Sequence, residues 1–325
     1  MTRGDSQKEE LRDANASCGR KGAHYYSSMF PIKLKFAVRN LLCMSLLAGI
    51  LPARAENPSQ ATRDATPTKP GVVSFTVESD YQKGPNKLEV LCPDAIKPGV
   101  KYPVVVILPV NTGLDGQWGS PVEEIRKQNL HNVYQVICVV PSYDIDPWYG
   151  DFPERPANGP FIRQQAYITD IVLPLLEKEF PVSTNSADRY LIGFSKSGFG
   201  ALGLLLRNPS LFHRAAVYDC ADPNPQGDIF QKWGMVNSYG SRENFDQNFF
   251  IPKLISDKKS EFQGKDRRIS LLAGSLSYGG VELIHKSLKE NKISYTYTIF
   301  PGMGHAWGDG WLPMAFASIL PVPVP

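Results

Sequence analysis

Residues 189–207 read RYLIGFSKSGFGALGLLLR, and this stretch decides the fold of the chain. The apolar run 190–192 is typical of a short buried strand, and it stops at Gly193. Helix-forming residues resume at 201–206, so the stretch predicts a strand, a tight turn and a helix. Ser195 lies in the turn, where a serine is presented above a sheet with the N-terminus of the next helix directed at it.

This turn resembles the nucleophile elbow of the α/β-hydrolase superfamily, whose pattern is G-x-S-x-G. Gly193 and Ser195 match the pattern, Ser197 stands at its second glycine, and Gly198 follows one place later. Small residues are needed there because the strand and the helix pass close to each other. The resemblance implies that Ser195 is a nucleophile, whereas the motif alone would also fit an ordinary glycine-rich connection.

Residues 1–55 have the composition of a targeting segment. From Met29 a basic stretch leads into the apolar run 41–51 and an A-x-A ending at Ala55, the order of parts in a secretory signal peptide. The apolar run is shorter than the about 20 residues that span a bilayer. We therefore expect a signal peptide at 29–55, a misassigned start that adds residues 1–28, and a secreted or periplasmic protein.

The charge of the chain lies mainly in that segment. Residues 1–55 carry nine Lys or Arg and four Asp or Glu, so the other 270 residues hold 26 basic and 28 acidic side chains, a net charge of −2 instead of +3. This balance argues against nucleic acid as a partner and against membrane binding after cleavage. Cys92, Cys138 and Cys220 remain, in or beside expected strands, which favours buried thiols but leaves one disulfide of undetermined pairing open.

Strand and helix patterns alternate along residues 71–325, which predicts a single α/β domain with a mostly parallel central sheet and helices on both faces. Residues 56–70 are polar and rich in Pro and Thr, which predicts a flexible lead-in. Residues 221–265, after the sixth strand, read as irregular and long enough for a small cap or lid insertion. Strands are expected at 72–77, 88–91, 102–110, 135–140, 190–192, 215–219, 269–273 and 294–300, and helices at 121–129, 161–180 with a kink at Pro174, 201–206, around 281–288 and at 311–319.

A serine becomes a nucleophile only when a base takes its proton. His305 lies in a glycine-rich loop after the last expected strand, the place of the histidine in the superfamily that the elbow resembles. The other interpretation is a loop histidine packed between Trp307 and Trp311.

The acid that would orient His305 is not at its usual place. Most superfamily members carry it in the loop after the strand expected here at 269–273, and that loop reads GSLSY. Some lipases of this fold carry the acid after the preceding strand instead, so the resemblance implies Asp219, with Asp222 as second candidate. Asp219 could also merely cap its strand, and Asp309, near His305 in sequence, is expected at the start of the final helix.

The remaining site residues are inferred from the same comparison. The backbone N–H of Lys196 and one from the loop after the strand 102–110 would form the oxyanion hole; Pro109 has no N–H, which leaves Val110 or Asn111 as the second donor. The Lys196 side chain is expected to be solvated. Two aromatic residues, Trp148 and Tyr149, are predicted to form a substrate-pocket wall, unless they only anchor their own loop.

The resemblance is closest to the putative-esterase branch, which includes secreted polyester depolymerases, feruloyl esterases and acetyl-xylan esterases. It implies a serine esterase that uses Ser195, His305 and Asp219, acts on a small-molecule or polysaccharide-linked ester through an acyl-enzyme, and needs no metal and no organic cofactor. Two alternatives stay open: a serine peptidase of the same fold and a catalytically silent binding protein. The substrate and the oligomeric state are not determined by the sequence.

Overall fold

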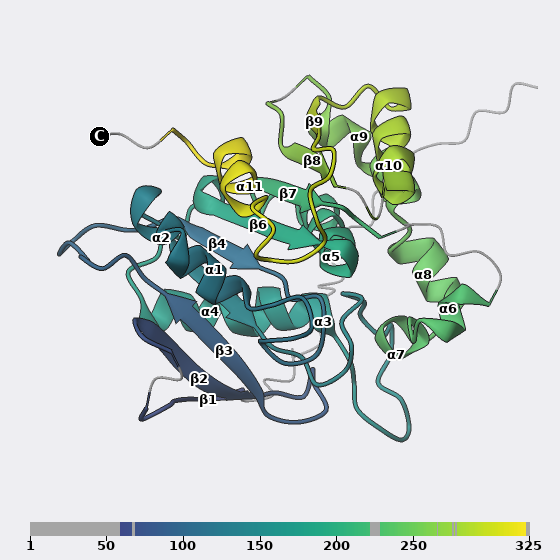
Figure 1. Ribbon diagram of the computed structural model, residues 1–325. Helices are drawn as coiled ribbons and strands as arrows, with labels where there is room; N and C mark the ends of the chain where they lie inside the picture. Colours follow the sequence, from purple (N-terminus) through teal and green to yellow (C-terminus); the bar gives the residue numbers. More distant parts are fainter. Residues whose placement is uncertain are drawn as a thin grey trace, which may run out of the picture. The chain divides into compact units, whose positions relative to one another are not determined.

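The computed structural model describes residues 59–66, 69–221, 228–264, 266–274, 276 and 278–322, and within them nine strands form one sheet in the order β1-β2-β3-β5-β4-β6-β7-β8-β9 (Figure 1). The first three strands pair antiparallel, as do β3 and β5, and every pair from β5 to β9 is parallel. The predicted α/β fold with a mostly parallel sheet is therefore confirmed. The strands are β1 Gln60–Arg63, β2 Val72–Glu78, β3 Asn86–Leu91, β4 Val104–Ile107, β5 Ile137–Pro141, β6 Arg189–Phe194, β7 Arg214–Tyr218, β8 Ile269–Ala273 and β9 Tyr295–Ile299.

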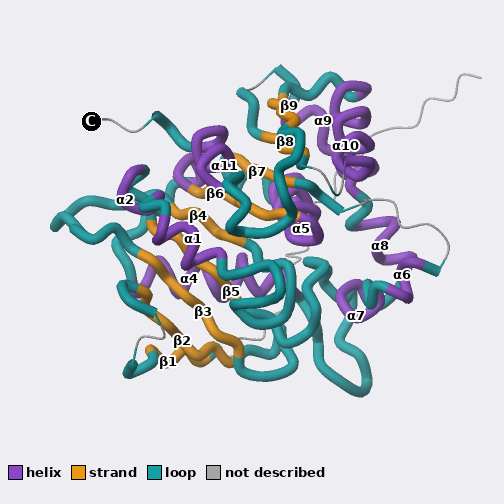
Figure 2. Tube along the Cα trace, in the orientation of Figure 1, coloured by secondary structure: helices purple, strands orange, loops and turns teal. Residues whose placement is uncertain are grey.

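Helices cover both faces of the sheet, as Figure 2 shows in purple against orange. Successive side chains of a strand point to opposite faces. In β4, Val104 and Val106 pack in the apolar cluster that contains α4 and α5, while Val105 and Ile107 pack in the cluster that contains α1 and α11. The helices are α1 Pro121–Lys127, α2 Leu130–Val133, α3 Gln164–Ala166, α4 Leu173–Glu179, α5 Ser195–Arg207, α6 Ile229–Lys232, α7 Val236–Tyr239, α8 Arg242–Asn248, α9 Ile251–Phe262, α10 Tyr278–Glu290 and α11 Leu312–Ile319, with a π-helix at Tyr167–Val172 and a 3₁₀-helix at Ser186–Asp188.

The prediction of a flexible lead-in at 56–70 is wrong for Gln60–Arg63. These residues form β1 and pair antiparallel with β2. All four side chains are exposed, so the strand has no hydrophobic alternation for a pattern to reveal. Backbone hydrogen bonds to β2 hold the strand in place. Because nearly every residue type can form such bonds, they cannot be predicted from the sequence.

The region after β7 is helical rather than irregular. Four helices, α6 to α9, lie between residues 229 and 262. Three of them have only four to seven residues, too short for a clear helical period. Buried aromatic side chains, among them Phe230, Tyr239 and Phe245, hold this insertion against the cluster that contains α5.

The predicted kink at Pro174 takes the form of a π-helical turn. The π-helix Tyr167–Val172 runs directly into α4, so that Pro174 is the second residue of α4. The helix is continuous across this junction, since the Leu173 N–H donates to the Ile168 carbonyl, so Pro174, which has no N–H, lies inside it. The helix thus continues past the proline with one widened turn.

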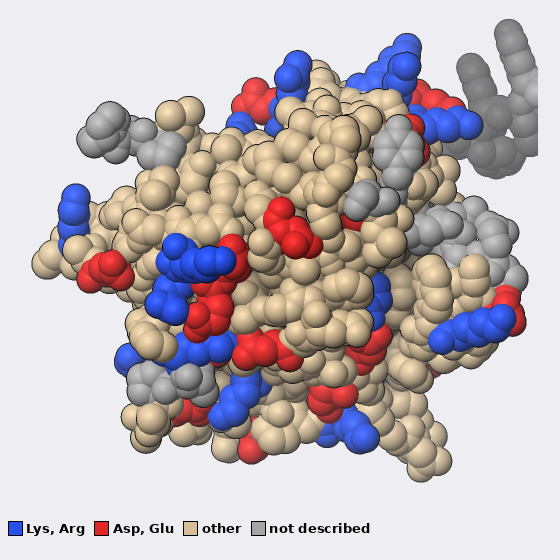
Figure 3. Space-filling model, viewed as in Figure 1, with Lys and Arg blue, Asp and Glu red and all other residues tan. Residues whose placement is uncertain are grey.

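The surface charges are of both signs (Figure 3), and the described cysteines lie within or beside the sheet. Lys and Arg are interspersed with Asp and Glu on the face shown in Figure 3. No helix within the described ranges is long and apolar enough to cross a membrane, and residues 1–55, with the expected signal peptide, lie outside those ranges. Cys92 and Cys138 are free thiols, and Cys220 is buried. Burial raises the pKa of the Cys92 thiol to about 11.

Candidate active site

The turn between β6 and α5 holds Ser195 in an unusual backbone conformation. Its φ is +53°, in the left-handed region that non-glycine residues rarely enter. Gly193 makes the turn possible: a Cβ on this residue would lie 2.2 Å from the carbonyl oxygen of Ser197, far inside contact distance. The strand and the helix therefore approach each other only because residue 193 has no side chain.

Ser197, which stands where the superfamily pattern has glycine, has a role in the turn. Its side chain is fully buried, and its hydroxyl accepts a hydrogen bond from the Phe194 N–H at 3.0 Å and donates one to the Phe194 carbonyl at 2.9 Å. A glycine would leave both backbone groups without these partners. The departure from the pattern therefore closes the elbow with two additional hydrogen bonds.

Asp219 and His305 meet although 86 positions separate them. Nδ1 of His305 lies 2.5 Å from Oδ2 of Asp219, whose side chain is fully buried. Asp219 directly follows β7, and the N–H groups of Gly274 and Leu276, in the loop after β8, donate to its carboxylate at 3.2 and 3.3 Å. Backbone donors favour the ionised form of a buried carboxylate. Because Nδ1 faces Asp219, Nε2 is the ring nitrogen left for a base.

Aromatic rings fix the orientation of the imidazole. His305 packs edge-on against Trp118 at 5.1 Å and against Phe194 at 5.0 Å between ring centroids. Trp118 and Phe194, rather than Trp307 and Trp311, therefore contact the ring. The hydroxyl of Tyr218 donates to the Gly304 carbonyl at 2.5 Å, which ties the histidine loop to the end of β7.

A cavity of about 690 Å³ is lined by both Ser195 and His305. It opens at the carboxyl ends of the parallel strands, where ligands bind in α/β sheets. The residues that line it are Val110, Asn111, Gln117, Trp118, Asp146, Trp148, Ser195, Lys196, Ala221, Lys232, Trp233, Leu276, Gly279, Gly280 and His305.

Residues 79–277, more than half of the chain, match the model of the family described as "Putative esterase". The chain belongs to this family.

Solved structures show the same fold. An S-formylglutathione hydrolase from Agrobacterium tumefaciens is 16% identical, with a TM-score of 0.61, over 79% of this chain and 99% of that chain. A ferulic acid esterase from the anaerobic fungus Anaeromyces mucronatus is 17% identical, with a TM-score of 0.52, over 80% and 92%. A fluorophosphonate-binding serine hydrolase from Staphylococcus aureus is 14% identical, with a TM-score of 0.54, over 80% and 96%. A search of curated proteins found no match.

Both residues predicted for the oxyanion hole, Lys196 and Asn111, line the cavity. Lys196 is the second residue of α5, so its N–H has no partner within the helix. Asn111 lines the cavity from the loop after β4, and its buried Oδ1 has no hydrogen-bond partner among the described residues. The hydroxyl of Tyr149 donates to the Pro109 carbonyl at 2.5 Å and holds that loop in place.

The two aromatic residues predicted for the pocket wall have different places. Trp148 lines the cavity, stacked on Trp233 of the insertion with centroids 5.6 Å apart and planes 8° apart. Tyr149 is only 1% exposed and lies behind the cavity, with its ring against Gly200 of α5. Its side chain belongs to the buried core and does not line the cavity, so its predicted place in the wall is wrong.

Sequence reasoning also missed two features of the cavity wall. Trp233 comes from the insertion read as irregular, and an exposed tryptophan beside a loop gives no periodic signal. The Lys196 side chain, expected to be solvated, forms an ion pair with Asp146 and lies over the Trp148 ring, 5.6 Å from its centroid. The wall therefore combines stacked indoles with a paired charge.

The other two carboxylates considered as the acid differ in whether they lie among the described residues. Asp222 lies outside them, and Asp309 lies beside Gly304, where a Cβ would be 2.4 Å from its Oδ2. Within that part of the chain, no three His, Cys, Asp or Glu side chains are grouped closely enough to hold a metal ion.

Proposed function

We propose that this chain is a secreted serine esterase that hydrolyses carboxylic esters. The observation that carries the proposal is the short contact between His305 and Asp219 in a cavity that Ser195 also lines. Membership of the "Putative esterase" family supports the ester bond as the target.

The mechanism follows from these positions. The Ser195 hydroxyl attacks the ester carbonyl while Nε2 of His305 takes its proton, and Asp219 stabilises the imidazolium that forms. The backbone N–H groups of Lys196 and Asn111 stabilise the negative charge that develops on the carbonyl oxygen. His305 then protonates the departing alcohol, and a water molecule activated by the same nitrogen releases the acid from Ser195.

The cavity supports small ester substrates with an apolar or aromatic part. Trp118, Trp148 and Trp233 line it, and flat indole rings bury apolar groups and stack on rings. The Anaeromyces mucronatus ferulic acid esterase has been solved in complex with ferulic acid. We extend this to esters of small acids, either free or attached to polysaccharides.

Labelling with a fluorophosphonate probe and hydrolysis of p-nitrophenyl butyrate test the proposal. The unchanged chain should be labelled and active, and Ser195→Ala should lose both properties. The matched control is Ser260→Ala, at an exposed position of α9, which should behave as the unchanged chain. Absence of labelling in the unchanged chain would favour the silent binding protein, and cleavage of peptides but not esters would favour the peptidase.

Export is tested separately. Expression from Met29, with residues 29–55, in a bacterial host should place the protein outside the cytoplasm with a new N-terminus at Glu56, measured by intact mass and N-terminal sequencing. A chain that stays in the cytoplasm with Met29 intact would contradict the signal peptide and leave the esterase proposal untouched.

A further inference from the structure

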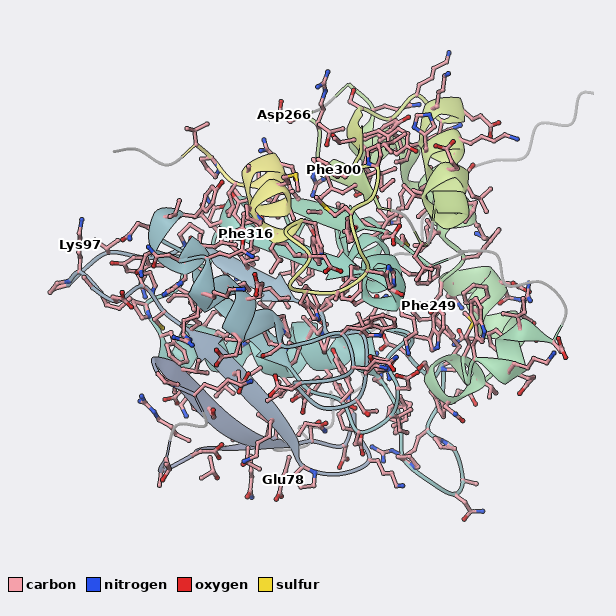
Figure 4. The ribbon with its side chains drawn as sticks, viewed as in Figure 1. Glu78, Lys97, Phe249, Asp266, Phe300 and Phe316 are labelled. Atoms are coloured by element: carbon pink, nitrogen blue, oxygen red, sulfur yellow. The ribbon has the colours of Figure 1, made fainter. Side chains whose placement is uncertain are left out.

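A second cavity, of about 520 Å³, lies at the amino-terminal ends of the parallel strands, whereas Ser195 lies at their carboxyl-terminal ends. Its lining comes from the start of β7, the segment before β8, the start of β9, and α11. Figure 4 labels Asp266 on the segment that leads into β8 and Phe316 on α11. Because β6 to β9 are parallel, all their amino-terminal ends lie on one side of the sheet and all their carboxyl-terminal ends on the other. This cavity is therefore separate from the candidate active site. The residues that line it are Arg214, Asp266, Arg267, Ser294, Thr296 and Ser318.

Polar side chains of three neighbouring strands face the same way here. Ala216, Ser270 and Thr296 are register partners across β7, β8 and β9, and Arg214 is two residues before Ala216, so all four share one face of the sheet. Nη1 of Arg214 donates to the Ile319 carbonyl of α11 at 3.3 Å. This bond fixes the guanidinium at the end of the cavity.

Several polar atoms in this region have no partner within the described part of the chain. They are Nε of Arg214, Oγ of Ser270 and Oγ1 of Thr296, and all three atoms are buried. Buried polar groups are nearly always hydrogen-bonded, so the two unpaired atoms on residues that line the cavity, Nε of Arg214 and Oγ1 of Thr296, call for a partner such as a bound ion or water. Ser318 is different, since its hydroxyl already donates to the Ala315 carbonyl.

The charges around the cavity favour an anion. Arg214 and Arg267 line it, and burial together with the positive charges of Arg214 and Arg268 lowers the pKa of the neighbouring His213. The opposing carboxylate of Asp266 lies 3.9 Å from Arg214, and its side chain is 82% exposed, so this ion pair is weak. Guanidinium groups bind oxyanions through parallel N–H donors.

We propose that this cavity binds a phosphate group, held by Arg214 and Arg267 with the hydroxyls of Ser294 and Thr296. Phosphate presents three or four acceptor oxygens, enough to serve two guanidinium groups and two hydroxyls at once, whereas a carboxylate presents two. The cavity is larger than inorganic phosphate needs, so a phosphate ester of a small molecule also fits. The proposal is independent of ester hydrolysis.

Calorimetric titration of the full chain tests the proposal with two probes, inorganic phosphate and glucose 6-phosphate, at constant ionic strength against sodium chloride. We expect one site, and binding of inorganic phosphate would identify the free ion as sufficient. Binding of glucose 6-phosphate alone would identify a phosphate ester as the ligand. No heat from either probe would overturn the proposal.

Variants assign any binding to this cavity. Arg214→Gln should raise the Kd for the probe by about tenfold or more, since it removes a charged donor. Thr296→Val keeps the shape, removes one hydroxyl, and should raise the Kd by about threefold; it decides the question if Arg214→Gln does not fold. Arg155→Gln is the matched control, because Arg155 is an exposed arginine far along the chain that pairs with Asp80. Unchanged binding in both cavity variants would also overturn the proposal.

Discussion

Three non-glycine residues around the candidate active site have backbone conformations in the left-handed region. They are Ser195, Asp219 and Tyr149, with φ of +53°, +43° and +57°. Each such residue is less stable by about 1 kcal/mol or more than in an ordinary conformation, and residues of this kind cluster at functional sites. Ser195 bears the proposed nucleophile, Asp219 holds His305, and Tyr149 holds the loop after β4. Asn129, Gln135 and Lys292 also have a positive φ and do not line the cavity, so the strain is shared between the candidate site and ordinary turns.

Replacing Asp219 tests the proposed acid. Asp219→Asn keeps the size of the side chain and removes the charge that stabilises the imidazolium, so kcat for p-nitrophenyl butyrate should fall by about 10³- to 10⁴-fold. The matched control is Asp309→Asn, four residues after His305, which should keep kcat within about threefold. Comparable losses in both variants would contradict the assignment of Asp219.

Removing the hydroxyl of Tyr149 tests its hold on the oxyanion loop. Tyr149→Phe leaves the ring against Gly200 and deletes only the hydrogen bond to Pro109. A bond of this kind is worth about 1 kcal/mol, so we expect kcat to fall by about fivefold with little change in KM. Steady-state kinetics with p-nitrophenyl butyrate measures both constants; a rise in KM at constant kcat would show that Tyr149 serves substrate binding instead.

At the scale of the element, two glycines of α5 differ in what lies beside them. A Cβ on Gly200 would lie 2.2 Å from the Tyr149 ring, whereas a Cβ on Gly203 would lie 3.3 Å from the flexible end of Gln165. We expect Gly200→Ala to lower the free energy of unfolding by about 1–3 kcal/mol through overpacking. Gly203→Ala should be neutral or stabilising by up to about 1 kcal/mol, because alanine favours the helix. Urea denaturation measures both, and equal effects would contradict this account of the packing.

The sequence predicted an element well where two sequence features, an apolar run and small residues at the adjoining turn, indicated the same structure. The strand and the helix around Ser195 combine apolar runs with small residues at the turn, and the structure places both where expected, with α5 beginning at Ser195 itself. The strand β1 has only exposed side chains, so its pairing with β2 could not be predicted. Trp233 was missed for a related reason, since stacking on Trp148 is a contact between distant segments.

The contact between Asp219 and His305 shows the same limit within the site. The sequence order suggested several acids, and only the three-dimensional register of β7, β8 and the histidine loop brings one of them to Nδ1. The catalytic role itself stays a prediction. The partner groups on the carboxylate, the N–H groups of Gly274 and Leu276, were not predictable, because backbone donors carry no residue preference.

At the scale of the whole molecule, the reactivity of the Cys92 and Cys138 thiols measures global unfolding. Cys138 is fully buried in β5, and burial raises the pKa of Cys92 to about 11, so about 0.1% of Cys92 is thiolate at pH 8. We expect neither thiol to react with a disulfide reagent within minutes in the native protein, and both to react at once in guanidinium chloride. Rapid reaction of Cys138 without denaturant would contradict the packing of the sheet.

The same shift of the Cys92 pKa links stability to pH. The folded state binds the thiol proton more tightly than the unfolded chain, whose thiol titrates near pH 9. Stability from this group is therefore present below pH 9 and is lost as the pH rises from 9 toward 11. Cys92→Ser should flatten that part of the stability curve relative to the unchanged chain, measured by urea denaturation at each pH.

The manner in which Asp219 is held offers an opening for protein engineering. Its carboxylate is supported in the loop after β8 by main-chain N–H groups, so the side chains of that loop are not needed to hold it. Leu276 donates its N–H to Asp219 while its own side chain, 64% exposed, borders the cavity that Ser195 and His305 line. Selectivity could accordingly be redesigned by mutagenesis at residue 276, with the reacting groups left in their native arrangement.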